Sequence, residues 1–165
     1  MQEEEYRSAA THAEPGNAPA MKVKLLSTAG EAKTYMVMFY KGDEAVSGLT
    51  EFATKYDVQS AHFQGIGSSF SAEMGWFDFD RLKYQVIPIG ISEVTSFTGN
   101  ITWYEGKPVV HAHAAASVKG GTVMGGHLLS MIVGPTLEIV VTAEPTRLTK
   151  KLNPEFNATM IDPDL

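Results

Sequence analysis

The sequence predicts an α+β (mixed α/β) protein, with one main helix packed on one mostly antiparallel mixed sheet. One segment carries apolar residues at helical spacing, whereas most of the rest consists of short apolar runs separated by turn residues. The chain has 165 residues, of which 44% are hydrophobic and 19% are charged. These proportions suit one compact domain with a substantial core.

Both ends of the chain are predicted to lie outside this domain. Residues 1–30 contain several glutamates and prolines, which indicate a flexible arm in which His12 is solvated. Residues 31–147 form the predicted domain. Residues 148–165 form the predicted C-terminal tail, which also contains prolines and polar residues.

The first predicted elements of the domain are a strand and the helix. Residues 34–40 are apolar on both alternating sets of positions, which is typical of a central strand. Asp43 can cap the helix that follows, because its carboxylate can accept hydrogen bonds from the N–H groups of the first turn. Apolar residues at helical spacing run from Ala45 to Tyr56, so one face of this helix should pack on the sheet.

The rest of the domain is predicted to be a series of short strands separated by turns. A tight turn is expected at the Gly65-Ile-Gly-Ser-Ser69 segment, which lacks the lysine of a phosphate-binding P-loop. The expected strands are Ser60–Gly67, Ser71–Asp78, Lys83–Gly90, Glu93–Asn100, Val109–Ser117, Val123–Val133 and Leu137–Ala143.

Charge and hydropathy argue against two classes of function. The net charge of -6 opposes general attraction to nucleic acid or anionic membranes, since phosphate binding needs clustered Lys and Arg. Lys150 and Lys151 are only a pair, which we expect to be solvated. No apolar run approaches the roughly 20 residues of a membrane-spanning helix, and no signal-peptide core is visible. A cytoplasmic location is the default expectation, and an exported protein whose signal peptide was removed before Met1 is the alternative.

The strongest chemical signal is a His-x-His pair formed by His111 and His113. The surrounding residues 108–117 are short and apolar and precede Gly120 and Gly121, which predicts a strand that ends in a turn. Side chains alternate faces along a strand, so both imidazoles should point the same way, about 6.6 Å apart. The alternate positions are mostly alanine and should allow another element to come close.

A third histidine, His127, follows Gly125 and Gly126, where the chain is expected to return in a neighbouring strand. The three histidines together offer three imidazoles to one divalent metal ion. The chain has no cysteine, so a cysteine-rich structural zinc site is excluded. Three imidazoles with an open position are typical of catalytic zinc, although imidazole also suits iron, nickel and copper. The alternative is a structural role, in which each histidine is hydrogen-bonded within the fold.

Five short motifs occur in an order that resembles the plant and prokaryote conserved (PPC) domain, also called DUF296. They are Gly65-Ile-Gly-Ser68, Gly75-Trp-Phe-Asp78, Ser96-Phe-Thr-Gly-Asn100, His111-Ala-His113 and Gly125-Gly-His-Leu128. The resemblance runs from about Glu31 to Glu144. It implies an α/β or α+β fold with one mixed sheet, a homotrimer, and a metal site at the three histidines.

The chain resembles the stand-alone prokaryotic members more than the plant members. Plant members carry AT-hooks, short Arg-Gly-Arg-Pro cores that enter the minor groove of DNA, and this sequence contains no such core. The plant family also has a Gly-Arg-Phe-Glu-Ile-Leu motif linked to partner binding. The matching stretch from Gly90 to Thr95 lacks the Arg-Phe pair, which argues against that partner role.

These observations lead to one main hypothesis and two alternatives. The main hypothesis is a trimeric protein whose three histidines hold zinc or a similar divalent ion, with a small anionic ligand completing the shell. The first alternative is a DNA-binding or protein-interaction module in which the histidines organise the core. The second is a metal-dependent hydrolase or lyase, with Glu73 and Glu93 as candidate general bases and His62 as a candidate lining residue. Each of these three side chains has an exposed or structural role as its alternative, and whether the protein is an enzyme stays open.

Overall fold

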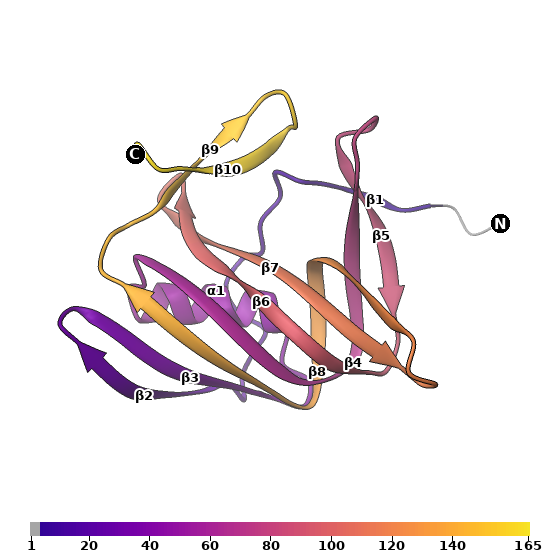
Figure 1. Cartoon of the computed structure of the whole chain (residues 1–165), viewed down its shortest axis with the longest axis horizontal. Helices are drawn as coiled ribbons and strands as arrows, with labels where there is room; N and C mark the ends of the chain where they lie inside the picture. The colour runs from indigo at the N-terminus through magenta and orange to yellow at the C-terminus, as the bar shows by residue number, and fades with distance from the viewer. Residues whose placement is uncertain (1–3) are drawn as a thin grey trace.

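The computed structural model describes residues 4–165, and these residues form a ten-stranded sheet with one helix on it (Figure 1). The elements in chain order are β1 (Tyr6–Ser8), β2 (Lys22–Ala29), β3 (Ala32–Tyr40), α1 (Ala45–Lys55), β4 (Ser60–Asp78), β5 (Lys83–Ile89), β6 (Ser92–Tyr104), β7 (Lys107–Val118), β8 (Val123–Glu144), β9 (Thr149–Asn153) and β10 (Ala158–Asp162). All strand pairs are antiparallel except a short contact between β6 and β9. The predicted α+β class is confirmed. The helix has 11 residues, and no helix in the described part of the chain is long and apolar enough to cross a membrane.

Four strands form a closed circuit of pairings, in which β4 pairs with β6, β6 with β7, β7 with β8, and β8 again with β4. The two longest strands, β4 with 19 residues and β8 with 22, make this possible. Register shifts interrupt the ladder between them, and such irregularities bend a strand so that its two halves can meet different neighbours. The sheet continues through β5 to β1 on one side and through β3 to β2 on the other.

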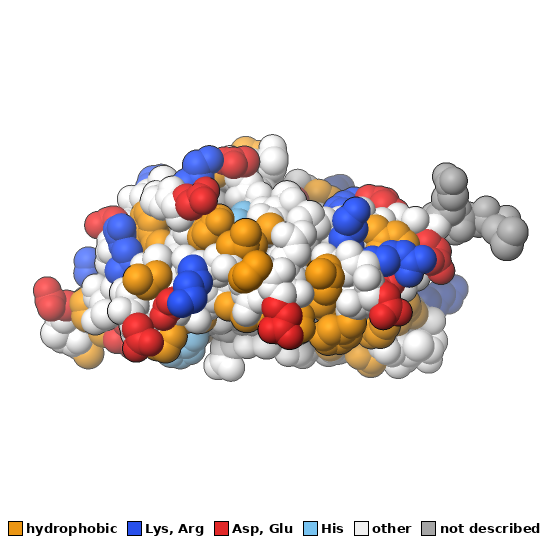
Figure 2. Space-filling model, turned by 90° about the horizontal axis from the view of Figure 1, so that it is seen from above, with side chains coloured by type: hydrophobic (Ala, Val, Ile, Leu, Met, Phe, Trp, Pro, Cys, Tyr) orange, Lys and Arg blue, Asp and Glu red, His pale blue; other side chains and the backbone are white. Residues whose placement is uncertain are grey.

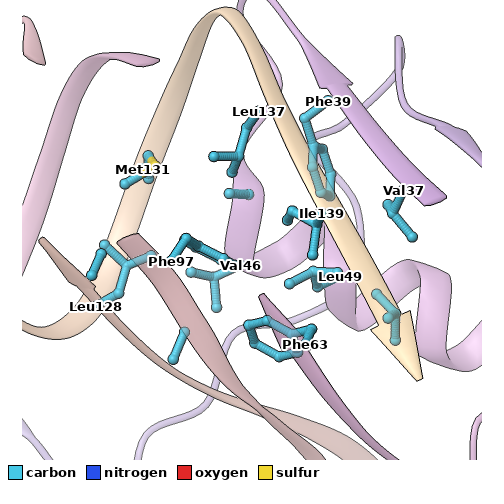
Figure 3. Packing of buried hydrophobic residues seen from close by; sticks show 14 of the residues in the cluster. Val37, Phe39, Val46, Leu49, Phe63, Phe97, Leu128, Met131, Leu137 and Ile139 are labelled. Atoms are coloured by element: carbon cyan, nitrogen blue, oxygen red, sulfur yellow. The ribbon is translucent and has the colours of Figure 1, made fainter. Parts of the chain in front are cut away.

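The core lies between α1 and the sheet (Figure 3). The helix contributes Val46 and Leu49, and the sheet contributes Phe63 and Phe97, whose stacked rings have centroids 5.4 Å apart. Full burial of a side chain of this kind stabilises the fold by about 1.5–3 kcal/mol. The packing of this face therefore fixes the strands that carry the candidate site on their opposite face.

The helix begins where the sequence predicts, but its N-cap is Glu44 and not Asp43. The Glu44 carboxylate accepts hydrogen bonds from two N–H groups of the first turn, at 3.2 and 2.7 Å. Asp43 is buried and accepts hydrogen bonds from the N–H groups of Ala20 and Tyr40, each at 2.9 Å. Asp43 therefore ties the N-terminal segment to the end of β3.

The tight turn predicted from Gly65 to Ser69 is wrong, because this segment lies inside the continuous strand β4. A Cβ atom at Gly65 or Gly67 would collide with the carbonyl oxygens of Glu138 or Thr136 in β8. These glycines thus allow two backbones to approach each other, and a register shift with β6 lies between them. The last two predicted strands are likewise one strand, β8.

The predicted flexible arm and tail differ from the structure, because both contain strands. In residues 1–30, β1 pairs with β5 and β2 pairs with β3, and in residues 148–165 β9 pairs with β10. Trp103 anchors the C-terminal segment: its backbone N–H donates to the carbonyl of Leu148 at 2.8 Å, and the Arg147 guanidinium lies 4.1 Å from its ring centroid. Backbone pairing thus orders segments whose composition is too polar to predict order. The expectation about Met1 lies outside the described residues.

Candidate metal centre

Strands β7 and β8 bring the three predicted histidines together. His111 and His113 lie on the same face of β7, and His113 lies directly opposite His127 in the ladder between β7 and β8. One ring nitrogen from each histidine lies within 4.8 Å of the other two. The predicted strand and its return in a neighbouring strand are confirmed. We call these three residues the histidine cluster.

Small residues permit this arrangement. The alternate positions of β7 are buried alanines. A Cβ atom at Gly125 would lie 2.6 Å from the carbonyl oxygen of Ala114, and one at Gly126 would lie 2.8 Å from that of Gly75. Real Cβ atoms do not come so close to a backbone, so both glycines allow the flanking strands to hold His127 in place.

The spacing of two ring nitrogens fits a tetrahedral metal ion. The Nε2 atoms of His111 and His113 are 3.3 Å apart. Two nitrogens bound to zinc at about 2.0–2.1 Å with a tetrahedral angle between them are about 3.3–3.4 Å apart. The same separation suits a long N–H···N hydrogen bond, so this distance fits both the metal-binding and the structural interpretation.

Two buried polar atoms without partners favour a ligand at this site. The Nδ1 atom of His127 is buried and has no hydrogen-bond partner among the described residues. The same holds for Oδ1 of Asn100, which lies opposite His111 in the ladder between β6 and β7. An unpaired buried polar atom costs about 1–3 kcal/mol. Coordination of an ion through Nδ1 would remove this cost for His127.

Burial keeps two members of the histidine cluster, His111 and His127, in the neutral form. The pKa of His111 is lowered to about 4 and that of His127 to about 3, mainly by burial and to a lesser extent by nearby charges, which include the ammonium group of Lys150. Neutral imidazole is the form that coordinates metal ions. The ring of His127 also stacks on that of Tyr84, with centroids 4.3 Å apart and an angle of 7° between the planes, which restricts its orientation.

A cavity of about 80 Å³ lies beside the histidine cluster. His111 and His127 form part of its wall, and His12, Lys150 and Thr159 form another part. The Lys150 side chain is 6% exposed, and its ammonium donates to the carbonyl of Thr159 at 3.4 Å. Nε2 of His12 lies 3.1 Å from the hydroxyl oxygen of Thr159.

The structure therefore corrects the expectation that His12 and Lys150 are solvated. Burial lowers the pKa of both side chains. Lys150 is buried because side chains alternate along β9, so that its neighbour Lys151 points outward and forms an ion pair with Asp162. No motif marks Lys150 or His12 in the sequence, since each reaches the cavity only through pairing of a terminal segment.

The candidate general base Glu73 does not belong to the histidine cluster. Its carboxylate accepts two hydrogen bonds from the Arg7 guanidinium, at 2.6 and 2.9 Å, and one from the Ser130 hydroxyl at 2.7 Å. The hydrogen bonds from Arg7, more than that from Ser130, hold the pKa of Glu73 below its ordinary value. Glu73 thus links β1 to β4 and β8.

Glu93 and His62 also lie outside the histidine cluster. Glu93 is an exposed residue of β6 and lies opposite Ser117, near the end of β7, whereas His113 lies opposite Thr98. His62 is an exposed residue of β4. The described structure therefore gathers three of the six predicted site residues and leaves these carboxylates and His62 elsewhere on the sheet.

Comparison with known proteins places most of the chain in one group. The sequence profile of the Plants and Prokaryotes Conserved (PCC) domain matches residues 26–145, which confirms the resemblance inferred from the motifs. No curated protein matches at a significant level.

Solved structures share the fold. A proposed DNA-binding protein from Ralstonia eutropha JMP134 is 34% identical, with 84% of this chain and 95% of that chain covered and a TM-score of 0.76. A plant- and prokaryote-conserved protein from Pyrococcus horikoshii is 26% identical, with 86% and 94% covered and a TM-score of 0.74. A metal-containing protein from Archaeoglobus fulgidus is 21% identical, with 87% and 98% covered and a TM-score of 0.73.

Proposed function

We propose a metal-binding function for this chain, which belongs to the Plants and Prokaryotes Conserved domain family. The proposed ligands are His111, His113 and His127, and the ion is divalent. The observation that carries the proposal is the convergence of three ring nitrogens to within 4.8 Å of one another. Zinc is the ion we expect, with iron or nickel as alternatives, because all three accept imidazole ligands. An ion held in this way supplies an open coordination position that can bind and polarise a small molecule.

The support comes from the side chains of this chain more than from its relatives. The Archaeoglobus protein is described as metal-containing, but at 21% identity its likeness shows the fold alone. The buried and unpaired Nδ1 of His127 is independent support, because a closed structural network would satisfy it. The proposal includes no general base, since the Glu73 carboxylate is already held by Arg7 and Ser130.

A second candidate function is DNA binding, because the Ralstonia relative, 34% identical, is described as a proposed DNA-binding protein. The net charge of -6 opposes it. Figure 2 shows Lys and Arg side chains interspersed with Asp and Glu on one face, without a continuous basic surface there. We expect no gel shift with A/T-rich duplex DNA at low salt. A shift that weakens steeply with added salt would favour the DNA-binding alternative over this expectation.

We also propose that the chain assembles as a homotrimer. Large apolar side chains are exposed on the single chain, including Ile66 at 60% and Ile91 at 75%, and such side chains are commonly covered in assemblies. Light scattering should give three times the chain's 17.9 kDa. A mass of one chain across micromolar concentrations would contradict the trimer and leave the metal site untouched.

The experiment that tests metal binding is elemental mass spectrometry on untagged protein. We expect about one metal ion per chain in the wild type and in His62→Ala, a control that removes an exposed histidine outside the histidine cluster. The double variant His111→Ala/His113→Ala should contain none. A metal-free wild type that also binds no zinc, iron or nickel on titration would make the histidines structural.

A further inference from the structure

We propose that the cavity beside the histidine cluster binds a small monocarboxylate, whose negative charge is paired with Lys150 and with the metal ion. The inference rests on the proposed metal binding and deepens it by naming the chemical class of the ligand. Three features of the cavity carry it: an unpaired buried cation, a wall without acidic groups, and a small volume with an apolar side.

Lys150 is a buried cation with little compensation. Its ammonium group has three N–H donors, and one of them reaches the carbonyl of Thr159 at 3.4 Å. None of the ion pairs among residues 4–165 includes Lys150, although its side chain is 6% exposed. A buried charge without a partner is costly, so an anion bound beside Lys150 would be stabilised strongly.

The wall of the cavity cannot supply that negative charge. No Asp or Glu lies among the residues that line it. Imidazole coordinates a metal ion in its neutral form, so the histidine ligands carry no negative charge that could balance a divalent ion. The ion and Lys150 would together place three positive charges around one small cavity, and an exogenous anion would offset part of this charge.

The volume and the remaining wall restrict the anion. The cavity holds about 80 Å³, roughly half of the ~150 Å³ that accommodates benzene in an apolar protein cavity. Val46, Val109 and Leu128 line another part of the wall. Apolar side chains suit a methyl or methylene group better than a fully polar oxyanion. A carboxylate with a short apolar end, of the size of acetate, would place its charge at the polar wall and its methyl group at the apolar wall.

The groups that select the anion lie outside the part of the chain that the family profile matches. The profile covers residues 26–145, whereas His12 precedes it and Lys150 and Thr159 follow it. The contact of 3.1 Å between His12 and Thr159 joins the two terminal segments over the cavity. The family domain thus supplies the proposed metal ligands, and the flanking segments supply the proposed charge that recognises the ligand.

The test is a titration of the full chain loaded with Co(II), whose visible absorption spectrum reports a change in the metal's ligands. Acetate should change the spectrum to saturation, whereas acetamide, which has the same shape without the charge, should not. Lys150→Met should weaken the apparent acetate affinity about 10- to 100-fold, because a charge-assisted contact is lost. Lys151→Met is the matched control and should leave it unchanged, since Lys151 is 68% exposed.

The outcomes separate the two proposals. Failure to bind Co(II) would overturn the metal site and the inference built on it. Uptake of Co(II) without a response to acetate would overturn only the carboxylate inference, as would an equal response to acetamide. Phosphate or bicarbonate binding more tightly than acetate would replace the monocarboxylate by an inorganic oxyanion. If Lys150→Met does not fold, Lys150→Gln gives the same comparison, and the acetate and acetamide titrations of the wild type need no variant.

Discussion

On strand β7, the side chains of Ala112 and Ala114 and those of His111 and His113 point to opposite faces of one backbone. The alanines are 1% and 5% exposed and belong to the hydrophobic core. The histidines lie in the cluster on the other face. Successive residues of one strand therefore alternate between core packing on one face and proposed metal binding on the other. The comparison teaches that stability and metal affinity should respond to different substitutions.

The largest expected effect lies on the core face. Phe97→Ala should lower the free energy of unfolding by about 3–5 kcal/mol, because Phe97 is 1% exposed and stacks on Phe63. Urea unfolding of the metal-free protein measures this loss. The folded fraction should still bind metal in the wild-type ratio. A loss below about 1 kcal/mol would show that this face is less tightly packed than the structure indicates.

The next largest effect lies on the histidine face, where a substitution should lower metal affinity and leave stability nearly unchanged. His113→Ala should weaken metal affinity by more than the roughly 10- to 100-fold that follows loss of a group that merely orients a metal ligand. Its metal-free stability should change by less than about 0.5 kcal/mol, because His113 is exposed. Competition with a chelator measures the affinity, with His62→Ala as the control. A large loss of stability in His113→Ala without a loss of metal affinity would mean that the histidine face serves packing and not metal binding.

Gly126→Ala should affect both faces, since the new Cβ would lie 2.8 Å from the carbonyl oxygen of Gly75. The backbone must shift, at a cost of about 1–3 kcal/mol, and the shift should move His127 and weaken metal binding. Gly90→Ala is the control, because its Cβ would meet nothing within 4 Å. Unchanged affinity in a destabilised Gly126→Ala variant would mean that the two faces are independent even here.

The smallest effect concerns the ion pair between Arg7 and Glu73, which does not belong to the histidine cluster. Glu73→Gln should cost at most about 1 kcal/mol at pH 7, because the pair is partly exposed. Metal affinity should be unchanged.

The difference between Glu73→Gln and the wild type should depend on pH. The pKa of Glu73 is lowered from its ordinary value of 4.5 by the hydrogen bonds from Arg7. The carboxylate therefore contributes stability above pH 4.5 and loses it as the pH falls through the lowered pKa. The difference in unfolding free energy between the wild type and Glu73→Gln should be present at pH 7 and should shrink as the pH falls below 4.5. A difference that persists at low pH would mean that the charge of Glu73 is not the cause.

Most of the candidate site could be predicted from local sequence. The alternation of histidine and alanine from His111 to Ala116 predicted one ligand face and one packed face, and burial follows that alternation. The Gly-Gly-His motif predicted the returning strand, and His127 pairs with His113. These features were accessible because strand periodicity and the close approach allowed by glycine act within a few residues.

The surroundings of the site depended on contacts between distant segments. Lys150 reaches the cavity because β9 pairs with β10 and is joined to β6, and His12 does so through Thr159. Similarly, a glycine such as Gly65 predicts either a turn or a close strand crossing, and only the approach of β8 decides between them.

The sequence by itself therefore determined the α+β class, the position of the helix and the three histidines on neighbouring strands. The tertiary structure alone decided that β4 and β8 are continuous, that Glu44 caps the helix, and that a buried lysine faces the histidine cluster. The physical reason is that periodicity and side-chain chemistry are local properties. Burial of a charge and closure of a cavity arise only when segments far apart in the chain pair with each other.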